Sequence, residues 1–134
     1  MPDGLAERLA RVRDRSTLRL THYGRRSGKP YQVTIWFMVD GATVYLGTMN
    51  RDRQWTRNVV ARPDVELAVD GERFRGRVTL LESVETKRHA YELMVAKYWI
   101  PWAIDRVVCL AGRDPRPHMA GGRGAFYRVD LHAD

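Results

Sequence analysis

The sequence has little cysteine and no long apolar run, and each of these shortages excludes a class of protein. One cysteine in 134 residues excludes an internal disulfide framework and indicates a reducing compartment, so we expect a cytoplasmic location. The most apolar stretch, residues 89–112, is interrupted by charged side chains, so we expect no stable membrane insertion. The first 15 residues have no apolar core after their charges, so we expect no signal peptide.

What the chain does contain points to a small basic globular protein. Hydrophobic residues make up 44% of the sequence, which is enough for a buried core, and the length corresponds to a single domain spanning residues 1–134. Lysine and arginine number 23 against 16 acidic residues, giving a formal net charge of +7. This excess of positive charge makes an anionic partner the first expectation.

The spacing of apolar residues predicts strands with helices at the margins. Helical spacing predicts an N-terminal helix within residues 1–15, and alternation from residue 16 predicts strands. Asp-Gly pairs at 40–41 and 70–71 are typical of tight hairpins. We expect an α+β fold, a six-stranded antiparallel β-barrel with flanking helices. Its predicted segments are barrel strands within 16–83 (the fifth at 73–83), a helix at 50–61, a helical segment at 84–111 broken at Pro101, a loop at 112–124 and a closing strand at 125–131.

The turn at residues 24–30, Gly-Arg-Arg-Ser-Gly-Lys-Pro, carries three cations and two glycines. It is not a P-loop, because the spacing is one residue short and a strand follows where a helix is required. Arginine makes bidentate contacts with phosphate and carboxylate groups, so the turn indicates an anion site. The alternative is a solvated hairpin tip.

The predicted helix at 50–61 places a tryptophan among arginines. Helical spacing puts Arg51, Trp55 and Asn58 on one face and turns Val59 and Val60 toward the barrel. Trp55 can stack on a planar ring, or it can pack into the core while the arginines stay in water. The spacing alone favours packing.

Aromatic residues gather around Pro101, and such stripes usually belong to a core, although Tyr98 and Trp99 can instead wall a ligand cavity. The four histidines and Cys109 are not arranged at metal-ligand spacing, so we expect no metal site. No nucleophile–base set or carboxylate pair is apparent either. An enzyme built this way would take its chemistry from an anionic, ring-bearing cofactor.

Several of these motifs, taken together, resemble the deazaflavin-dependent nitroreductase family. They are the segment 21–30, the Asp-Gly hairpin, Trp55-x-x-Asn58 and Arg62-Pro-Asp-Val65. The resemblance covers roughly residues 16–83 well and the closing strand weakly. It implies the split β-barrel of pyridoxamine-phosphate-oxidase-like proteins. It also implies coenzyme F(420), a deazaflavin with a phosphate and an oligoglutamate tail, whose reduced form is the hydride donor.

The resemblance further implies a site with three groups of residues. The phosphate and the tail carboxylates would be held by Arg25, Arg26, Ser27 and Gly28. The ring would be lined by Thr48, Met49, Asn50, Gln54 and Trp55, with Asn58 supporting it. The substrate would be bound by Trp36, Tyr98, Trp99 and Trp102. No catalytic residue is assigned, and Tyr98 is the candidate proton donor.

The expected activity is therefore hydride transfer from reduced F(420) to an electron-poor acceptor: a quinone, an enone or a nitro compound. Two alternatives stay open: an FMN-dependent oxidoreductase with the same fold, and a barrel that binds a cofactor or ligand without catalysis. Nucleic-acid binding is suggested by charge alone and is not expected, because no recognition motif accompanies the charge. A homodimer is expected from the resemblance.

Overall fold

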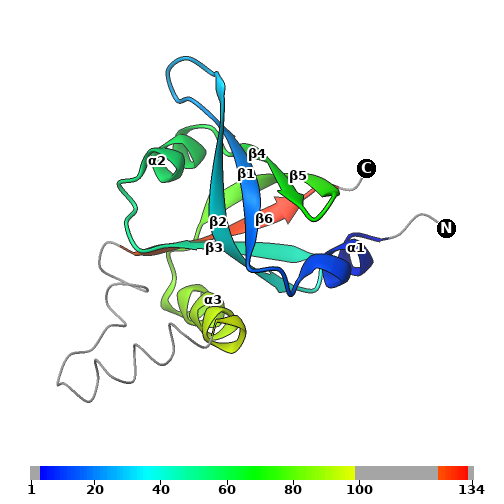
Figure 1. Ribbon diagram of the computed structural model, residues 1–134. Coiled ribbons are helices and arrows are strands. Elements are labelled where there is room, and N and C mark those ends of the chain that lie inside the picture. Colours follow the sequence, from blue (N-terminus) through cyan, green and yellow to red (C-terminus); the bar gives the residue numbers. More distant parts are fainter. Residues whose placement is uncertain (1–3, 99–123, 133–134) are drawn as a thin grey trace.

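Six antiparallel strands close into one barrel in the computed structural model, which describes residues 4–98 and 124–132 (Figure 1). The strand order is β1-β2-β3-β6-β5-β4, and β4 pairs back with β1. This confirms the six-stranded antiparallel barrel. The strands are β1 (Thr17–Tyr23), β2 (Pro30–Asp40), β3 (Thr43–Thr48), β4 (Asp64–Val69), β5 (Glu72–Leu80) and β6 (Ala125–Leu131).

Alternation along the strands fills the barrel with apolar side chains, because successive residues of a strand point to opposite faces. The fully buried members include Leu20, Phe37, Val44, Leu46, Leu67, Tyr127 and Val129. Two short helices add to this core from opposite sides of the barrel (Figure 1). The helix α1 (Leu5–Val12) contributes Leu9. The helix α2 (Gln54–Ala61) contributes Trp55 and Val59.

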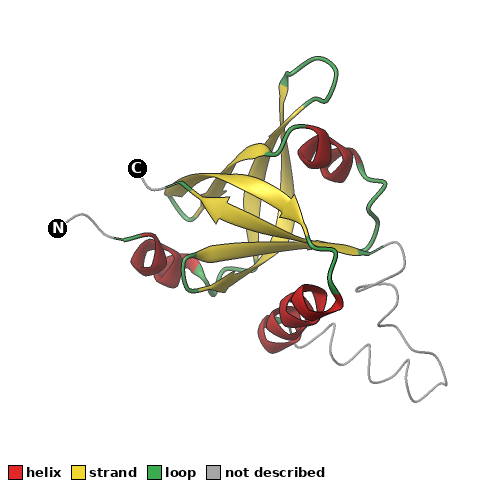
Figure 2. Ribbon diagram, turned by 180° about the vertical axis from the view of Figure 1, so that it is seen from behind, coloured by secondary structure: helices red, strands yellow, loops and turns green. Residues whose placement is uncertain are grey.

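The third helix, α3 (Val84–Lys97), packs outside the barrel wall and makes a second, smaller core (Figure 2). Met38 points to the face of β2 opposite Phe37, yet it is buried because α3 covers it. Phe126 of β6 is buried in the same way. The outer face of β2 is therefore apolar where α3 lies on it, and this end of β2 becomes part of the candidate site.

The helix predicted at 50–61 begins four residues later than expected, at Gln54. The Thr48 hydroxyl accepts a hydrogen bond from the Asn50 N–H at 3.1 Å, and the Asn50 side-chain oxygen accepts one from the Asp52 N–H at 2.9 Å. These local bonds hold turns in place of a first helical turn. Val60 was predicted to face the barrel, but it is 61% exposed because the helix turns it outward.

The fifth strand ends at Leu80, three residues before the predicted end. The reason is Ser83, whose hydroxyl accepts a hydrogen bond from the Thr86 N–H at 3.1 Å and so caps α3. The helix ends at Lys97. The rest of the predicted helical segment, its break at Pro101, the loop to 123, Trp99 and Trp102 lie outside the described residues.

Candidate functional site

The turn between β1 and β2 projects from the barrel beside α2 (Figure 1). The Gly24 N–H donates to the Lys29 carbonyl at 2.9 Å, and the Gly28 N–H donates to the Gly24 carbonyl at 2.8 Å. Gly28 has a φ of +72°, which favours glycine, and the Arg62 guanidinium lies against it. The Ser27 hydroxyl accepts from the Lys29 N–H at 3.2 Å. The turn is therefore a closed loop whose shape is set by its own backbone.

Asn58 ties this turn to α2. It is only 4% exposed, and its side-chain oxygen accepts hydrogen bonds from the Arg25 N–H at 3.2 Å and the Arg25 Nη1 at 2.9 Å. Gln54, one turn earlier on α2, also accepts from Arg25 Nη1 at 2.9 Å. Asn58 thus holds the turn against α2. Arg25 uses its Nη1 for hydrogen bonds to α2, and its Nε and Nη2 remain for a ligand.

His22 of β1 lies beneath the turn and is 4% exposed. Its Nδ1 is 3.1 Å from the side-chain nitrogen of Asn58, and its ring stacks on Tyr31 with centroids 5.8 Å apart. Burial lowers the pKa of His22 below its ordinary value, because a buried imidazolium loses its hydration. The ring is therefore neutral at physiological pH.

These elements surround an open groove of about 810 Å³, here called the basic groove. Four arginines line it and, among the described residues, no carboxylate does. This excess of positive charge in the lining favours binding of an anion. The basic groove is lined by Arg25, Arg26, Arg53 and Arg57, together with His22, Gly24, Ser27, Tyr31, Gln32, Val33, Gln54, Trp55 and Asn58.

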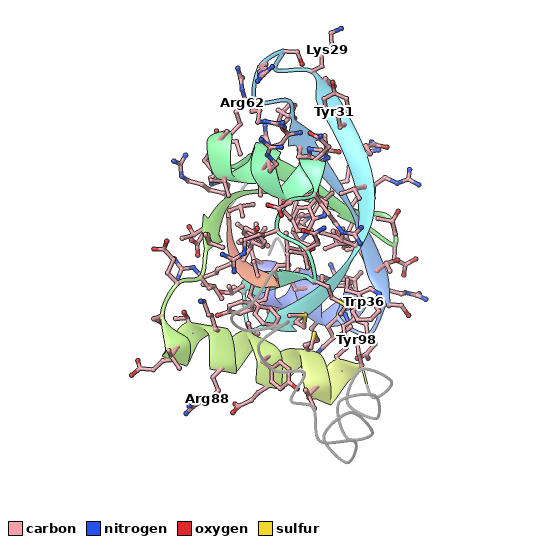
Figure 3. The ribbon with its side chains drawn as sticks, turned by 90° about the vertical axis from the view of Figure 1, so that its left-hand side faces the viewer. Lys29, Tyr31, Trp36, Arg62, Arg88 and Tyr98 are labelled. Atoms are coloured by element: carbon pink, nitrogen blue, oxygen red, sulfur yellow. The ribbon has the colours of Figure 1, made fainter. Side chains whose placement is uncertain are left out.

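A second hollow of about 220 Å³, here called the apolar groove, lies farther along β2. Arg53 and Trp55 line both hollows, so the two are neighbours with a shared wall. Figure 3 shows this separation along the strand, with Tyr31 near the turn and Trp36 near the end of α3. The apolar groove is lined by Thr34, Ile35, Trp36, Met38, Gly47, Thr48, Met49, Arg53, Trp55 and Met94.

Trp36 and Tyr98 form a stacked pair at the apolar groove, with ring centroids 4.8 Å apart and planes 15° apart (Figure 3). Trp36 is 44% exposed. The Tyr98 hydroxyl accepts from the Phe37 N–H at 3.1 Å and lies 2.7 Å from the Ser16 carbonyl. Burial raises the pKa of Tyr98 above its ordinary value. Tyr98 therefore supports Trp36 from behind through a hydroxyl engaged with the main chain.

Lys97, the last residue of α3, is a half-buried cation beside Tyr98. Its Nζ donates to the Phe37 carbonyl at 2.9 Å and lies 3.5 Å from the centroid of the Phe37 ring. Loss of hydration on burial lowers the Lys97 pKa to about 8. The charged form of Lys97 therefore carries a desolvation penalty that an exposed lysine would not have.

Most of the sequence-predicted site residues lie on the two grooves. Arg25, Arg26, Ser27, Gln54, Trp55 and Asn58 line the basic groove, while Trp36, Thr48 and Met49 line the apolar groove. Asn50 and Gly28 line neither of the two and shape the neighbouring loops. Trp55 is 5% exposed and packs on Tyr127, so the expectation that it packs into the core is confirmed, although it also borders both grooves.

Sequence reasoning left His22, Arg53 and Arg57 out of the predicted site. His22 carries one visible signal, a polar side chain at an inward position of an alternating strand. Arg53 and Arg57 flank Trp55, but sequence spacing could not distinguish a groove wall from a solvated face. The position of α2 beside the turn decides this.

The described residues contain neither a membrane-spanning helix nor a cluster of metal ligands. None of the helices there is long and apolar enough to cross a membrane. Across residues 4–98 and 124–132, no group of three or more His, Cys, Asp or Glu side chains is placed to hold a metal ion.

Solved structures similar to this chain share its fold. A proposed pyridoxamine 5′-phosphate oxidase from Listeria innocua matches with a TM-score of 0.68 and 15% identity, covering 96% of this chain and 94% of the other. An F(420)-H(2)-dependent reductase matches with a TM-score of 0.65 and 20% identity, covering 87% and 95%. A structure described as a domain-swapped dimer gives 0.64 and 20%, covering 87% and 81%. The fold is thus the expected split β-barrel.

No curated protein matches the sequence significantly. A family model does match: that of the F(420)H(2)-dependent quinone reductases, over residues 6–101. The matched range contains the turn, α2, β2 and most of both grooves. The chain therefore belongs to the F(420)H(2)-dependent quinone reductase family and is an oxidoreductase that uses reduced coenzyme F(420).

Proposed function

We propose that the basic groove binds the phosphate and tail of F(420), and that the apolar groove holds its ring and the acceptor. The observation that supports this most is the pairing of two neighbouring hollows, one with four arginines and no lining carboxylate, the other largely apolar. Small-molecule sites commonly occupy about 300–1,000 Å³, and the basic groove falls within this range.

The arginines fit the anionic part of the cofactor. The side chains of Arg26 and Arg57 have no hydrogen bond or ion pair within the described part of the chain, so their guanidinium groups are open to a ligand. Arg25 has Nη1 committed to α2 and therefore both positions the helix and offers its remaining nitrogens. Guanidinium groups recognise phosphate and carboxylate oxygens through paired charge-assisted hydrogen bonds. We expect Arg26 and Arg57 to contribute most to affinity.

The apolar groove fits a planar ring. Met38 and Met94 give it a polarizable floor, and Thr48 and Met49 border it where β3 ends. Gly47 lies so close to Phe126 that a Cβ there would be 3.2 Å from its ring, so a larger residue would require the Phe126 ring to shift by a few tenths of an ångström. When bound, reduced F(420) supplies the hydride. The chain's own part is to orient the ring and exclude water from it.

The proposed acceptor is a quinone, as the family name indicates. Trp36 supports this, since it borders the apolar groove and its indole is 44% exposed, giving a planar acceptor a surface on which to stack. Tyr98 positions Trp36 in this proposal. For Tyr98 to act as the proton donor, its hydroxyl would have to leave the main chain of Phe37 and Ser16.

We also propose a homodimer in the cytoplasm. The similar structure described as a domain-swapped dimer supports the first part. The single cysteine supports the second, because cytoplasmic proteins seldom depend on disulfides. Sedimentation at several protein concentrations tests the oligomeric state.

The test is a fluorescence titration with oxidised F(420), with FMN in parallel. We expect saturable micromolar or tighter binding of F(420) and weak binding of FMN. Stopped-flow oxidation of the reduced coenzyme should then be fastest with a quinone, compared with an activated alkene and a nitroaromatic compound. Preference for FMN would contradict the cofactor assignment, and binding without oxidation of any acceptor would support a non-catalytic barrel.

A further inference from the structure

The tautomer of His22 follows from its neighbours. The Asn58 oxygen accepts two hydrogen bonds from Arg25, which fixes the amide so that its nitrogen faces His22. An amide nitrogen only donates, so it donates to His22 Nδ1, 3.1 Å away. The neutral imidazole therefore carries its proton on Nε2.

The Nε2–H of His22 is left with no partner among the described residues. It is not a buried unsatisfied atom either, since the described part of the chain contains none. His22 lines the basic groove. The Nε2–H of His22 therefore has no hydrogen-bond acceptor among these residues and keeps some access to solvent. Because His22 borders the basic groove, this N–H can donate to a ligand bound there.

The charged and titratable groups around this donor favour an anion. Arg25 and Arg26 face the groove from the turn, Arg53 and Arg57 face it from α2, and Tyr31 of β2 stacks on the imidazole. No carboxylate lines this groove within the described ranges. Burial opposes a charge on His22 in the free protein, so the ring meets a bound anion as a neutral donor.

We propose that the Nε2–H of His22 is an additional anion ligand of the basic groove, donating to a phosphate or carboxylate oxygen of bound F(420) while the imidazole stays neutral, because its Nδ1 accepts from the fixed Asn58 amide. This inference rests on the proposed cofactor site. It adds to that site a ligand which differs from the arginines, since it donates a hydrogen bond without carrying a charge.

The contact needs the neutral ring. A proton on Nδ1 would face the Asn58 amide nitrogen, which also donates and is held in place by Arg25. Binding of F(420) through the Nε2–H should therefore proceed without uptake of a proton by His22, and the contact should add the same amount to affinity at pH 7 and at pH 8.

The variant His22→Asn separates the proposed contact from the structural role of the residue. The asparagine oxygen can take the place of Nδ1 and accept from Asn58, but nothing replaces the groove-facing N–H. His89→Asn is the matched control, because His89 lies on α3 and pairs with Asp40 at 2.8 Å. We expect His22→Asn to raise the Kd for oxidised F(420) about tenfold at pH 7, with His89→Asn unchanged.

NMR spectra of the histidine rings with and without oxidised F(420) complete the test. The His22 Nε2–H proton should shift downfield and exchange more slowly with water on binding, while the ring signals of His89 stay unchanged. If the backbone amides of residues 25–29 shift on binding but the His22 Nε2–H does not, the His22 inference is wrong and the cofactor site stands. If those amides do not shift at all, both are overturned.

Discussion

The two grooves are built by different interactions, and the difference predicts how each fails. The basic groove is held by hydrogen bonds that converge on Asn58 from the turn and from β1. The apolar groove is held by packing of α3 on the outer face of β2, with the Trp36–Tyr98 stack at its edge. Directional bonds fix charges at defined positions, whereas packing makes a surface that tolerates several shapes. The first groove should therefore determine cofactor affinity and the second acceptor preference.

The largest expected effect is loss of the Asn58 network. Asn58→Leu removes the acceptor of two Arg25 bonds and the donor to His22 in a site that is almost sealed from water. Breaking such a buried network costs about 2–4 kcal/mol of unfolding free energy. Urea denaturation should show this loss, and F(420) affinity should fall with it because the turn is no longer held against α2.

Asn58→Asp is the matched control for this network. The carboxylate keeps the acceptor for Arg25 but cannot donate to His22, so stability should fall less than in Asn58→Leu. Its negative charge also raises the pKa of His22, which NMR can detect. Equal losses in the two variants would mean that the Arg25 bonds contribute little.

The second effect is on affinity without a change in folding. Arg26→Ala removes a guanidinium that has no partner within the described ranges, so the Kd for F(420) should rise about 10- to 100-fold while the urea midpoint stays the same. The salt dependence of binding should also become shallower. Arg19→Ala, an exposed arginine of β1 that lines neither groove, is the control and should change neither quantity. Matching titration curves for Arg26→Ala and the wild type would remove Arg26 from the site.

The third effect should appear at the apolar groove alone. Trp36→Ala removes the exposed indole on which the acceptor is proposed to stack, so kcat/KM for a quinone should fall about tenfold. The Kd for F(420) should change less than in Arg26→Ala, because the phosphate and tail are held in the basic groove. Trp36→Phe keeps an aromatic face and should recover most of the activity. A large rise in the F(420) Kd for Trp36→Ala would show that the two grooves are not separable in function.

The smallest effect concerns Lys97. Its folded pKa of about 8 lies below the value of about 10.4 in an unfolded chain. Between these values the unfolded state binds more protons, so this lysine makes stability rise with pH across that window and costs the full penalty at pH 7. Lys97→Met should raise the Tm at pH 7 by about 3 °C, with the gain shrinking toward pH 10.5. Lys87→Met, at a second lysine of α3, is the control for the loss of a positive charge from this helix.

The strands and the basic turn could be predicted because their signals are local. Alternation in β1 places Leu18, Leu20 and His22 on the inner face, and this is observed. The turn needs glycine at a φ of +72°, and Gly28 provides it. The start of α2 could not be placed, because Thr48 and Asn50 form turns whose bonds compete with a helix.

The sequence by itself determined the strands, the hairpins and the excess of arginine near the turn, since each depends on neighbours along the chain. The tertiary structure alone decided which residues meet. Arg25 and Asn58 are 33 positions apart, and Trp36 and Tyr98 are farther still. Closing the barrel brings α2 under the turn and α3 onto β2, and the same closure creates the grooves. Local spacing carries no information about such long-range contacts, because they depend on how the whole sheet curves.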